Sequence, residues 1–317
     1  MRGSFIFFLI LLLAALGLFF NFAWKFFPAA SRSPKELFVI SKVFSASEAA
    51  EKLEKGGFIK DQSAFEQAVG MENKEKEIQA GGYFISKSMS VFSIAKILLA
   101  DPAQKWVTLP EGLRKEEAAE ILAKELNWSG SRKEEFLAAA REGYVFPETY
   151  LLDTSLGGKE VAGILSGQFD EEAKQWIGSY DNGLSLEETV ILASLVQRES
   201  IGEKEMSLVA GVIFNRLNEG MKLDIDATLQ YQKGSAEEWW PPASSADKSV
   251  VSVFNTYLNK GLPPSPICSP GAEALKAAMF PQESRYFYYL HDSSGQIHYA
   301  RTYEEHLANV NKYLRSR

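Results

Sequence analysis

An uncharged apolar segment near the N-terminus constrains this 317-residue chain more than any other feature. Ser4–Trp24 reads SFIFFLILLLAALGLFFNFAW and contains no charged residue. About twenty apolar residues in a helix cover the roughly 30 Å hydrocarbon core of a bilayer. The segment therefore predicts one membrane-spanning helix, with residues 1–27 forming a short stub and an anchor.

A cleaved signal peptide is the alternative to a retained anchor. Pro28-Ala29-Ala30-Ser31 would serve as a cleavage site. However, the apolar core of a signal peptide usually runs about 7–15 residues, and this segment is longer and bulkier. We therefore expect a retained anchor, and in either case the remaining residues are expected outside the cytoplasm.

Composition excludes several classes of function. The net charge is −7, with 34 basic and 41 acidic residues and no basic stripe, which argues against nucleic acid as a partner. One cysteine excludes a disulfide framework and a cysteine-based zinc site, and three histidines without HExxH spacing leave little for a catalytic metal. No GxGxxG or Walker A loop occurs. We predict neither a metal nor another cofactor.

Residues 28–102 predict a Pro/Ser/Ala linker and a small β-α-α-β module, and residues 103–317 a larger mixed α+β domain. The fold class expected is therefore α+β behind a transmembrane helix. In the module we expect a strand over Glu36–Phe44, a helix over Ser47–Lys55 capped by Ser47, a helical stretch through Val69, a strand over Gly81–Ile85 and a helix over Met89–Leu99. In the larger domain we expect a strand over Trp106–Leu109, helices over Lys115–Leu126 and Ser131–Arg141, and an irregular segment over Tyr144–Tyr150.

The segment SLEETVILASLVQRES predicts a helix over Ser185–Ser200 that brings a carboxylate to an apolar face. Ser185 with Glu188 three residues later forms a capping box at its start. Three apolar residues lie seven, four and three positions before Glu199 and share its face: Leu192, Leu195 and Val196. Glu199 is therefore expected at the buried edge, near the end of the helix.

Burial among apolar side chains raises the pKa of a glutamate, and a raised pKa suits a general acid at neutral pH. The alternative is a structural ion pair between Glu199 and Arg198 or another cation. This helix alone leaves both interpretations open.

Two polar segments follow. We expect a helix over Met206–Asn218, with Gly220 as its C′ residue. The segment Lys222–Tyr231 then brings hydrogen-bonding side chains beside an aromatic ring, a combination that suits carbohydrate binding. A polar loop with one packed tyrosine is the alternative. Phe254–Tyr257 forms a further cluster before a proline-rich run. Cys268, an isolated thiol, is expected to serve packing.

Taken in order along the chain, these segments resemble the endolytic murein transglycosylases of the YceG-like family. The resemblance covers nearly everything after the anchor and is most specific from Leu192 to Gly271. The matching pieces are AGGYF near Gly82, the PEG turn at Glu111, EGYVFPETY, LASLVQRES, FNRLNEGMKLDIDATLQY, FNTYLNKGLPPSPICSPG and GQIHYARTYEEH.

The chain departs from the family pattern at a few positions. Gln197 and Arg198 stand where the family usually has lysine and glutamate, beside an unchanged Glu199. Asp224 replaces a usual glutamine and Ala227 a usual proline, while Phe254 replaces a usual tyrosine and lacks its hydroxyl.

The resemblance implies lytic cleavage of the β-1,4 bond between N-acetylmuramic acid and N-acetylglucosamine in nascent glycan strands. It implies 1,6-anhydro-muramic acid ends, termination of glycan polymerisation and Glu199 as the general acid/base. The residues expected to bind the glycan are Asn215, Asp226, Thr228, Tyr231, Asn255, Thr256 and Tyr257. Asp226 could orient the sugar or the acid, or cap its loop.

The resemblance also implies a LysM-like glycan-binding module within residues 28–102. It places the chain in the bacterial cytoplasmic (inner) membrane as a single-pass protein with its catalytic domain outside the cytoplasm. Peptidoglycan glycan strands are the expected partner, together with the membrane, and peptidoglycan synthases are further candidate partners.

A glycoside hydrolase ordinarily needs two carboxylates, and the sequence offers one strongly placed glutamate. Glu203 and Glu205 look solvent-facing. A lytic enzyme needs no second carboxylate, because the muramic acid C6 hydroxyl is the internal nucleophile. Two alternatives stay open: a hydrolytic muramidase that pairs Glu199 with Glu148 or Asp226, and a non-catalytic envelope scaffold that binds glycan.

Overall fold

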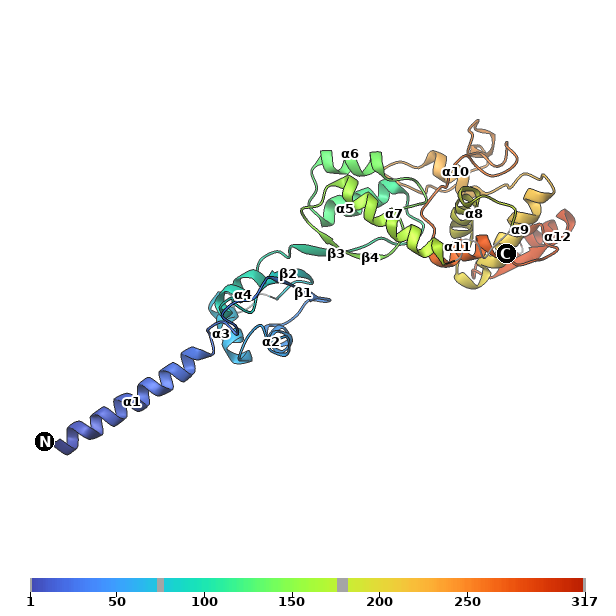
Figure 1. Cartoon of the computed structure of the whole chain (residues 1–317). Helices are drawn as coiled ribbons and strands as arrows, with labels where there is room; N and C mark the ends of the chain where they lie inside the picture. The colour runs from blue at the N-terminus through green and yellow to red at the C-terminus, as the bar shows by residue number, and fades with distance from the viewer. Residues whose placement is uncertain (1, 73–76, 176–181, 316–317) are drawn as a thin grey trace. The chain divides into compact units, whose positions relative to one another are not determined.

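The computed structural model describes residues 2–72, 77–175 and 182–315 of the chain (Figure 1). It divides into two compact units: Met1–Val107 with Tyr150–Ser155, and Thr108–Thr149 with Leu156–Arg317. The division expected after residue 102 did not include the return of Tyr150–Ser155 to the first unit.

The first unit combines an apolar helix with a four-stranded sheet and three short helices. Its elements are α1 (Arg2–Trp24), β1 (Glu36–Ile40), α2 (Ala46–Lys55), α3 (Gln62–Glu72), β2 (Gly81–Ile85), α4 (Val91–Leu98), β3 (Gln104–Thr108) and β4 (Thr149–Asp153). Within α1, Ile6–Trp24 is long and apolar enough to cross a membrane, a criterion that a signal sequence also meets. The expected β-α-α-β order is confirmed as β1-α2-α3-β2.

The sheet has the order β1-β2-β3-β4, and β1 pairs antiparallel with β2, with Phe38 opposite Tyr83. Alternating residues of the two strands face a core shared with α2, α3 and α4, in which Ile40, Phe65 and Ile85 are fully buried. The unit thus has its own hydrophobic core.

Three local predictions for this part were wrong. Ser45, not Ser47, caps α2, because Ser45 has a glutamate three residues later and so forms a capping box with Glu48. β1 ends at Ile40, and Phe44 forms only an isolated bridge with Ile78. Strand β4 takes up the end of the segment expected to be irregular.

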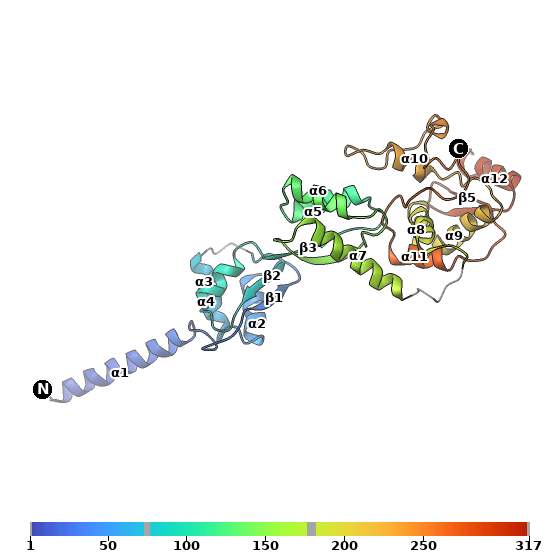
Figure 2. The ribbon, with the colours of Figure 1, turned by 45° about the horizontal axis from the view of Figure 1, so that its top comes forward.

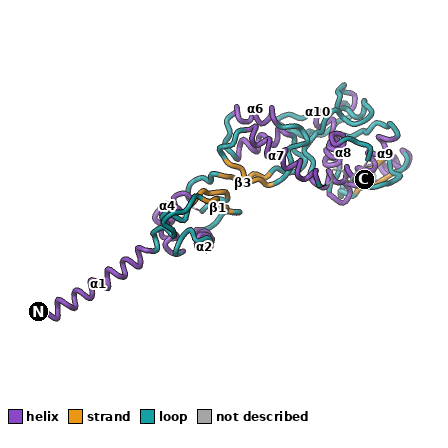
Figure 3. Tube along the Cα trace, viewed as in Figure 1, coloured by secondary structure: helices purple, strands orange, loops and turns teal. Residues whose placement is uncertain are grey.

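The second unit is mostly helices and loops (Figure 3). Its elements are α5 (Lys115–Glu125), α6 (Gly130–Ala139), α7 (Gly158–Lys174), α8 (Leu186–Glu199), α9 (Glu203–Asn218), α10 (Asp226–Lys233), a 3-10 turn (Asp247–Ser249), α11 (Ala272–Met279), β5 (Tyr288–His291), β6 (Ile297–Ala300), α12 (Tyr303–Asn309) and a π-helical turn (Val310–Arg315).

Helix α8 lies at the centre of this unit, beside α9 and α11 in both views (Figures 1 and 2). Every residue from Thr189 to Val196 is buried, so the helix is enclosed on all sides over two turns. The predicted capping box is confirmed: the Ser185 hydroxyl accepts from the Glu188 N–H at 3.2 Å and the Glu188 carboxylate accepts from the Ser185 N–H at 2.8 Å. The core therefore fixes where α8 ends.

Helix α9 carries the C-terminal hairpin. It ends at Asn218 as predicted, followed by Gly220 with φ of +61°, but it starts three residues before the expected Met206. Strands β5 and β6 pair antiparallel, with Tyr289 opposite Tyr299. Asn215 on α9 donates to the carbonyl oxygens of Ser284 (3.1 Å) and Tyr286 (2.9 Å), which ties the segment before β5 to the helix.

Candidate active site

A cavity of about 490 Å³ opens at the C-terminal end of α8. It is bounded by residues of α8, α9, α10, the hairpin, α12 and two loops. Its lining residues are Glu199, Val212, Ile213, Arg216, Leu223, Asp224, Asp226, Lys248, Tyr257, Tyr288, Tyr289, Tyr303 and His306. Hydroxyl, carboxyl, cationic and aromatic groups therefore meet in one space.

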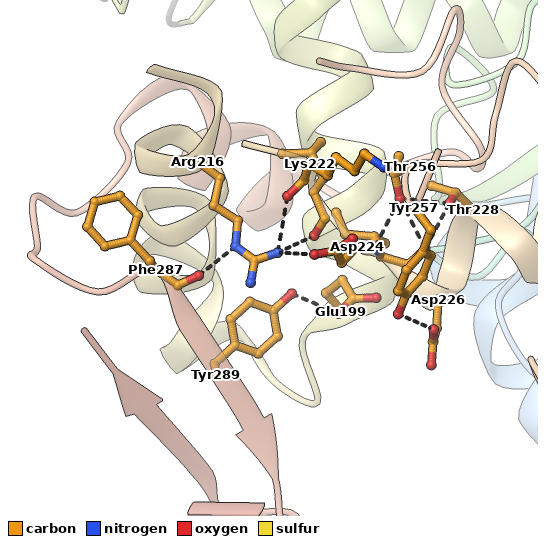
Figure 4. Close-up of polar contacts among 12 residues, drawn as sticks. Glu199, Arg216, Lys222, Asp224, Asp226, Thr228, Thr256, Tyr257, Phe287 and Tyr289 are labelled. Carbon is orange, nitrogen blue, oxygen red and sulfur yellow. Dashed lines mark hydrogen bonds and ion pairs between the residues drawn. The ribbon is translucent and has the colours of Figure 1, made fainter. Parts of the chain in front are cut away.

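Glu199 is the last residue of α8 and presents its carboxyl to this cavity (Figure 4). The Tyr289 hydroxyl donates a hydrogen bond to Glu199 Oε2 at 2.7 Å. Burial raises the pKa of Glu199, and the negative charge of Asp226 raises it further. The hydrogen bond from Tyr289 and the charge of His291 act in the opposite direction. The net effect favours a protonated carboxyl.

No ion pair joins Arg198 to Glu199 among the described residues. The Arg198 guanidinium instead stacks on the Trp240 ring at 3.8 Å. The ion pair with Arg198 considered from the sequence is therefore not what holds Glu199.

Arg216 organises one wall of the cavity (Figure 4). Its Nε donates to the Phe287 carbonyl at 2.5 Å and its Nη1 to the Leu223 carbonyl at 2.6 Å. The same Nη1 lies 3.6 Å from the Asp224 carboxylate. One guanidinium therefore connects α9 to the strand that carries Tyr289 and to the loop that carries Asp224.

The opposite wall joins the start of α10 to the loop that carries Tyr257, with a buried hydroxyl contact beneath it. The Tyr257 hydroxyl donates to Asp226 Oδ1 at 2.7 Å, and both side chains line the cavity. Behind them, Thr228 and Thr256 share a hydrogen bond of 3.1 Å, and Thr256 Oγ1 accepts from the Ile225 N–H at 2.9 Å. These buried contacts hold the start of α10 to the loop that carries Tyr257.

The structure brings some of the predicted site residues together and separates others. Asp226 and Tyr257 line the cavity with Glu199. Thr228, Asn255 and Thr256 are buried and lie outside the lining residues, where they hold its loops. Asn215 and Tyr231 also lie outside the lining.

Tyr231 belongs to a different cluster. Its ring stacks with the Arg114 guanidinium at 4.5 Å and lies 6.3 Å from the Trp240 ring. Its hydroxyl donates to Glu142 at 3.4 Å. Burial and the charge of Glu116 raise the pKa of Glu142 to about 7. Glu142 accepts a hydrogen bond from the Lys115 N–H at 3.2 Å and therefore caps the start of α5. It is not among the residues that line the cavity.

The other candidate carboxylates occupy distinct places. Glu148 is exposed, and its Oε1 accepts from the adjacent Thr149 N–H at 3.1 Å. Glu203 is exposed as expected. The expectation that Glu205 faces solvent is wrong, because its side chain is 14% exposed and lies 2.9 Å from His291 Nε2. Asp226 and Asp224 are the carboxylates that share the cavity with Glu199.

Sequence reasoning missed several lining residues, above all Tyr289, Arg216, Lys248 and Tyr288. Arg216 lies in the segment FNRLNEGMKLDIDATLQY, which carried the resemblance, and Tyr289 lies shortly before the segment GQIHYARTYEEH. No spacing in the sequence links either residue to Glu199. The tyrosine-rich segment RYFYYLH was the available signal, because four consecutive aromatic residues, Tyr286–Tyr289, favour a strand that presents rings on both of its faces.

The described residues hold no group of three or more His, Cys, Asp or Glu side chains suited to a metal ion. Cys268 is fully buried against α8, its thiol 3.4 Å from the Ser194 carbonyl, and burial raises its pKa well above the ordinary value. The expectation of no cofactor stays a prediction.

The fold and the cavity define a protein in which one partly buried glutamate, its pKa raised, lies in a cavity lined by hydroxyl, cationic and aromatic side chains. The YceG-like family model matches residues 38–312, and the chain belongs to this family. It is 27% identical over 305 residues to a Bacillus subtilis protein named endolytic murein transglycosylase, covering 86% of this chain and 83% of the relative. A Streptococcus pneumoniae D39 protein of the same name is 26% identical over 99% of this chain, which spans 65% of that relative's length.

A solved structure shows the same fold. The crystal structure of a YceG-like protein from Listeria monocytogenes matches with a TM-score of 0.57 and 24% identity, over 87% of this chain and 99% of that one.

Proposed function

We propose that this chain is an endolytic peptidoglycan transglycosylase in which Glu199 is the catalytic acid and base. The observation that carries the proposal is the Glu199 carboxyl, with its pKa raised by burial, facing a cavity of hydroxyl and aromatic groups. Membership of the YceG-like family and the names of the relatives support the choice of substrate.

In this mechanism the protonated Glu199 donates its proton to the glycosidic oxygen as the bond from C1 of N-acetylmuramic acid breaks. The resulting carboxylate removes the proton from the C6 hydroxyl of the same sugar, and O6 bonds to C1. A 1,6-anhydro ring forms, the carboxyl regains its proton, and no water is consumed. Aromatic rings such as Tyr257 and Tyr288 suit the apolar faces of the sugars.

The proposal extends to location and partners. Helix α1 would anchor the chain in the bacterial cytoplasmic membrane, with both units outside the cytoplasm and the cavity acting on nascent strands, so that cleavage terminates polymerisation. The β-α-α-β module of the first unit would bind glycan in the manner of a LysM-like module. Peptidoglycan synthases, the source of nascent strands, are the proposed protein partners.

One observation favours a second candidate, a hydrolytic muramidase. Asp226 lines the cavity with Glu199, and its charge acts on Glu199, so a second carboxylate is present to activate water. The products distinguish the two reactions, because lytic ends are one water lighter than the reducing ends of hydrolysis.

The test uses purified peptidoglycan, the full-length chain in detergent and mass spectrometry of the released glycans. We expect anhydro-muramic ends, their loss in Glu199→Gln, and retained glycan binding by that variant. Glu148→Gln is the matched control, since this exposed glutamate lies outside the cavity, and it should cleave like the wild type. If the released glycans carry reducing ends, the protein is a hydrolytic muramidase. If the folded wild type cleaves no glycan, the interpretation that stands is the non-catalytic scaffold that binds glycan.

A further inference from the structure

Tyr289 approaches the Glu199 carboxyl from a part of the chain that no motif connects to it. Its hydroxyl donates to Glu199 Oε2 at 2.7 Å, across 90 residues of sequence. Burial and the neighbouring Glu199 raise the pKa of Tyr289 well above its ordinary value. The tyrosine hydroxyl therefore keeps its proton at physiological pH and acts as a donor.

The backbone that carries Tyr289 is tied to α9 on both sides. Two residues earlier, the Phe287 carbonyl accepts from Arg216 Nε at 2.5 Å. Two residues later, His291 Nε2 lies 2.9 Å from Glu205 Oε1. Arg216 and Glu205 both belong to α9, and β6 pairs with β5 through Tyr289 and Tyr299. The hydroxyl is thus held in place by the framework of the unit.

We propose that Tyr289 is the positioning residue of the catalytic glutamate: its hydroxyl donates to Oε2 of Glu199 and, with the Ala227 N–H as a second donor near this carboxyl, fixes the orientation in which the carboxyl exchanges its proton with the sugar. This inference rests on the proposed function. A carboxyl without this contact can rotate and share its proton between two oxygens, whereas a held carboxyl presents one oxygen to the scissile bond.

Several charged or titratable groups surround Glu199. Asp226 comes from α10, Arg216 from α9, His291 from β5 and His306 from α12, while Asp224, Lys248 and Tyr257 come from the loops. Removing the Tyr289 hydroxyl deletes none of these groups. That removal takes away a donor that stabilises the ionised carboxylate, so the pKa of Glu199 rises. The carboxyl then stays protonated to higher pH.

The experiment compares Tyr289→Phe with the wild type in two measurements on the full-length protein. In Tyr289→Phe, the decline of kcat for peptidoglycan cleavage at high pH (the high-pH limb of the profile) should begin about one pH unit higher than in the wild type. A shift of this size is equivalent to the loss of one charge-assisted hydrogen bond. The maximal kcat should fall about tenfold, with KM changed less than about twofold, since the contact acts on proton transfer more than on binding. A structural role alone would not move the limb.

The second measurement needs no activity. A ¹³C NMR titration of glutamate-labelled protein reads the pKa of the Glu199 carboxyl, with Glu199→Gln identifying its signal. Tyr299→Phe is the matched control, because it removes a hydroxyl from the cross-strand neighbour of Tyr289 and should leave both the limb and the titration unchanged.

An unchanged Glu199 titration and an unchanged limb in folded Tyr289→Phe would overturn the proposal. An equal shift in Tyr299→Phe would also overturn it, by assigning the effect to the hairpin in general. If the wild type releases no glycan ends, the proposed function fails, while the titration still decides whether Tyr289 controls Glu199.

Discussion

The Asn255 side chain is fully buried and holds together a loop that carries two cavity residues. Its Nδ2 donates to the carbonyls of Val250 (2.7 Å) and Lys248 (3.2 Å), and its Oδ1 accepts from the Tyr257 N–H at 2.9 Å. Leaving buried polar groups unpaired costs about 1–3 kcal/mol each. We expect Asn255→Ala to lower the free energy of unfolding by about 2–4 kcal/mol in urea titrations and to reduce cleavage, because Lys248 and Tyr257 lose their support.

Asn259 in the same loop provides the control. It is exposed, and its amide donates to the Ser252 carbonyl at 2.7 Å and to the main-chain carbonyl of Asn255 at 3.1 Å, a bond that Asn255→Ala leaves in place. Since solvent replaces an exposed contact, Asn259→Ala should cost less than about 1 kcal/mol. Equal losses in the two variants would contradict the role assigned to Asn255.

At the scale of elements, α9 depends on a glycine where the segment leading to β5 crosses it. A Cβ at Gly211 would clash with the Gln282 carbonyl oxygen. Gly211→Ala should therefore destabilise the fold by about 1–3 kcal/mol, as overpacking does, and lower kcat, because Gln282 leads into the strand that carries Tyr289. Thermal unfolding and the cleavage assay measure both effects.

The matched control for this prediction is Gly163→Ala. Gly163 also lies inside a helix, α7, but nothing approaches its Cβ position within 4 Å. Alanine there should be neutral or stabilise by up to about 1 kcal/mol, through helix propensity alone. A Gly211→Ala variant as stable as Gly163→Ala would show that Gln282 moves aside freely.

The helices and strands differ in how well the sequence predicts them. Helix α8 and its capping box follow from local patterns, and so does the presence of Glu199 near its buried end, because side chains seven, four and three residues apart share one helix face. Helix α10 could not be predicted from the sequence, because the polar and apolar residues of Lys222–Tyr231 alternate and show no helical periodicity. Tyr289 could not be placed, because only the tertiary packing of α9 and the hairpin brings it to Glu199.

At the scale of the whole chain, the residues that follow α1 are part of the first unit. Lys25 Nζ lies 2.7 Å from the Asp61 carboxylate, and the Phe26 ring stacks on Phe92 with centroids 5.3 Å apart. The Ala30 N–H donates to the Lys87 carbonyl at 2.9 Å. The cleavage site considered at Pro28–Ser31 therefore lies in a packed segment, and cutting there would remove Phe26, a partly buried side chain that packs against the core of the small module.

We expect that the apolar helix is retained. Expressed at full length in a bacterium, the chain should stay with the membrane pellet after alkaline carbonate washing, and its intact mass should include residues 1–27, because Ile6–Trp24 is long enough to span the bilayer and longer than the apolar core of an ordinary signal peptide. Phe26→Ala should keep the protein in the membrane but lower its unfolding temperature, since it removes packing against Phe92, Phe22 and the core of the first unit and leaves the apolar helix in place. A soluble product whose mass begins near Ala29 would reverse the conclusion and make α1 a signal sequence. The proposed cleavage of nascent strands would then proceed without the cavity being held to the membrane.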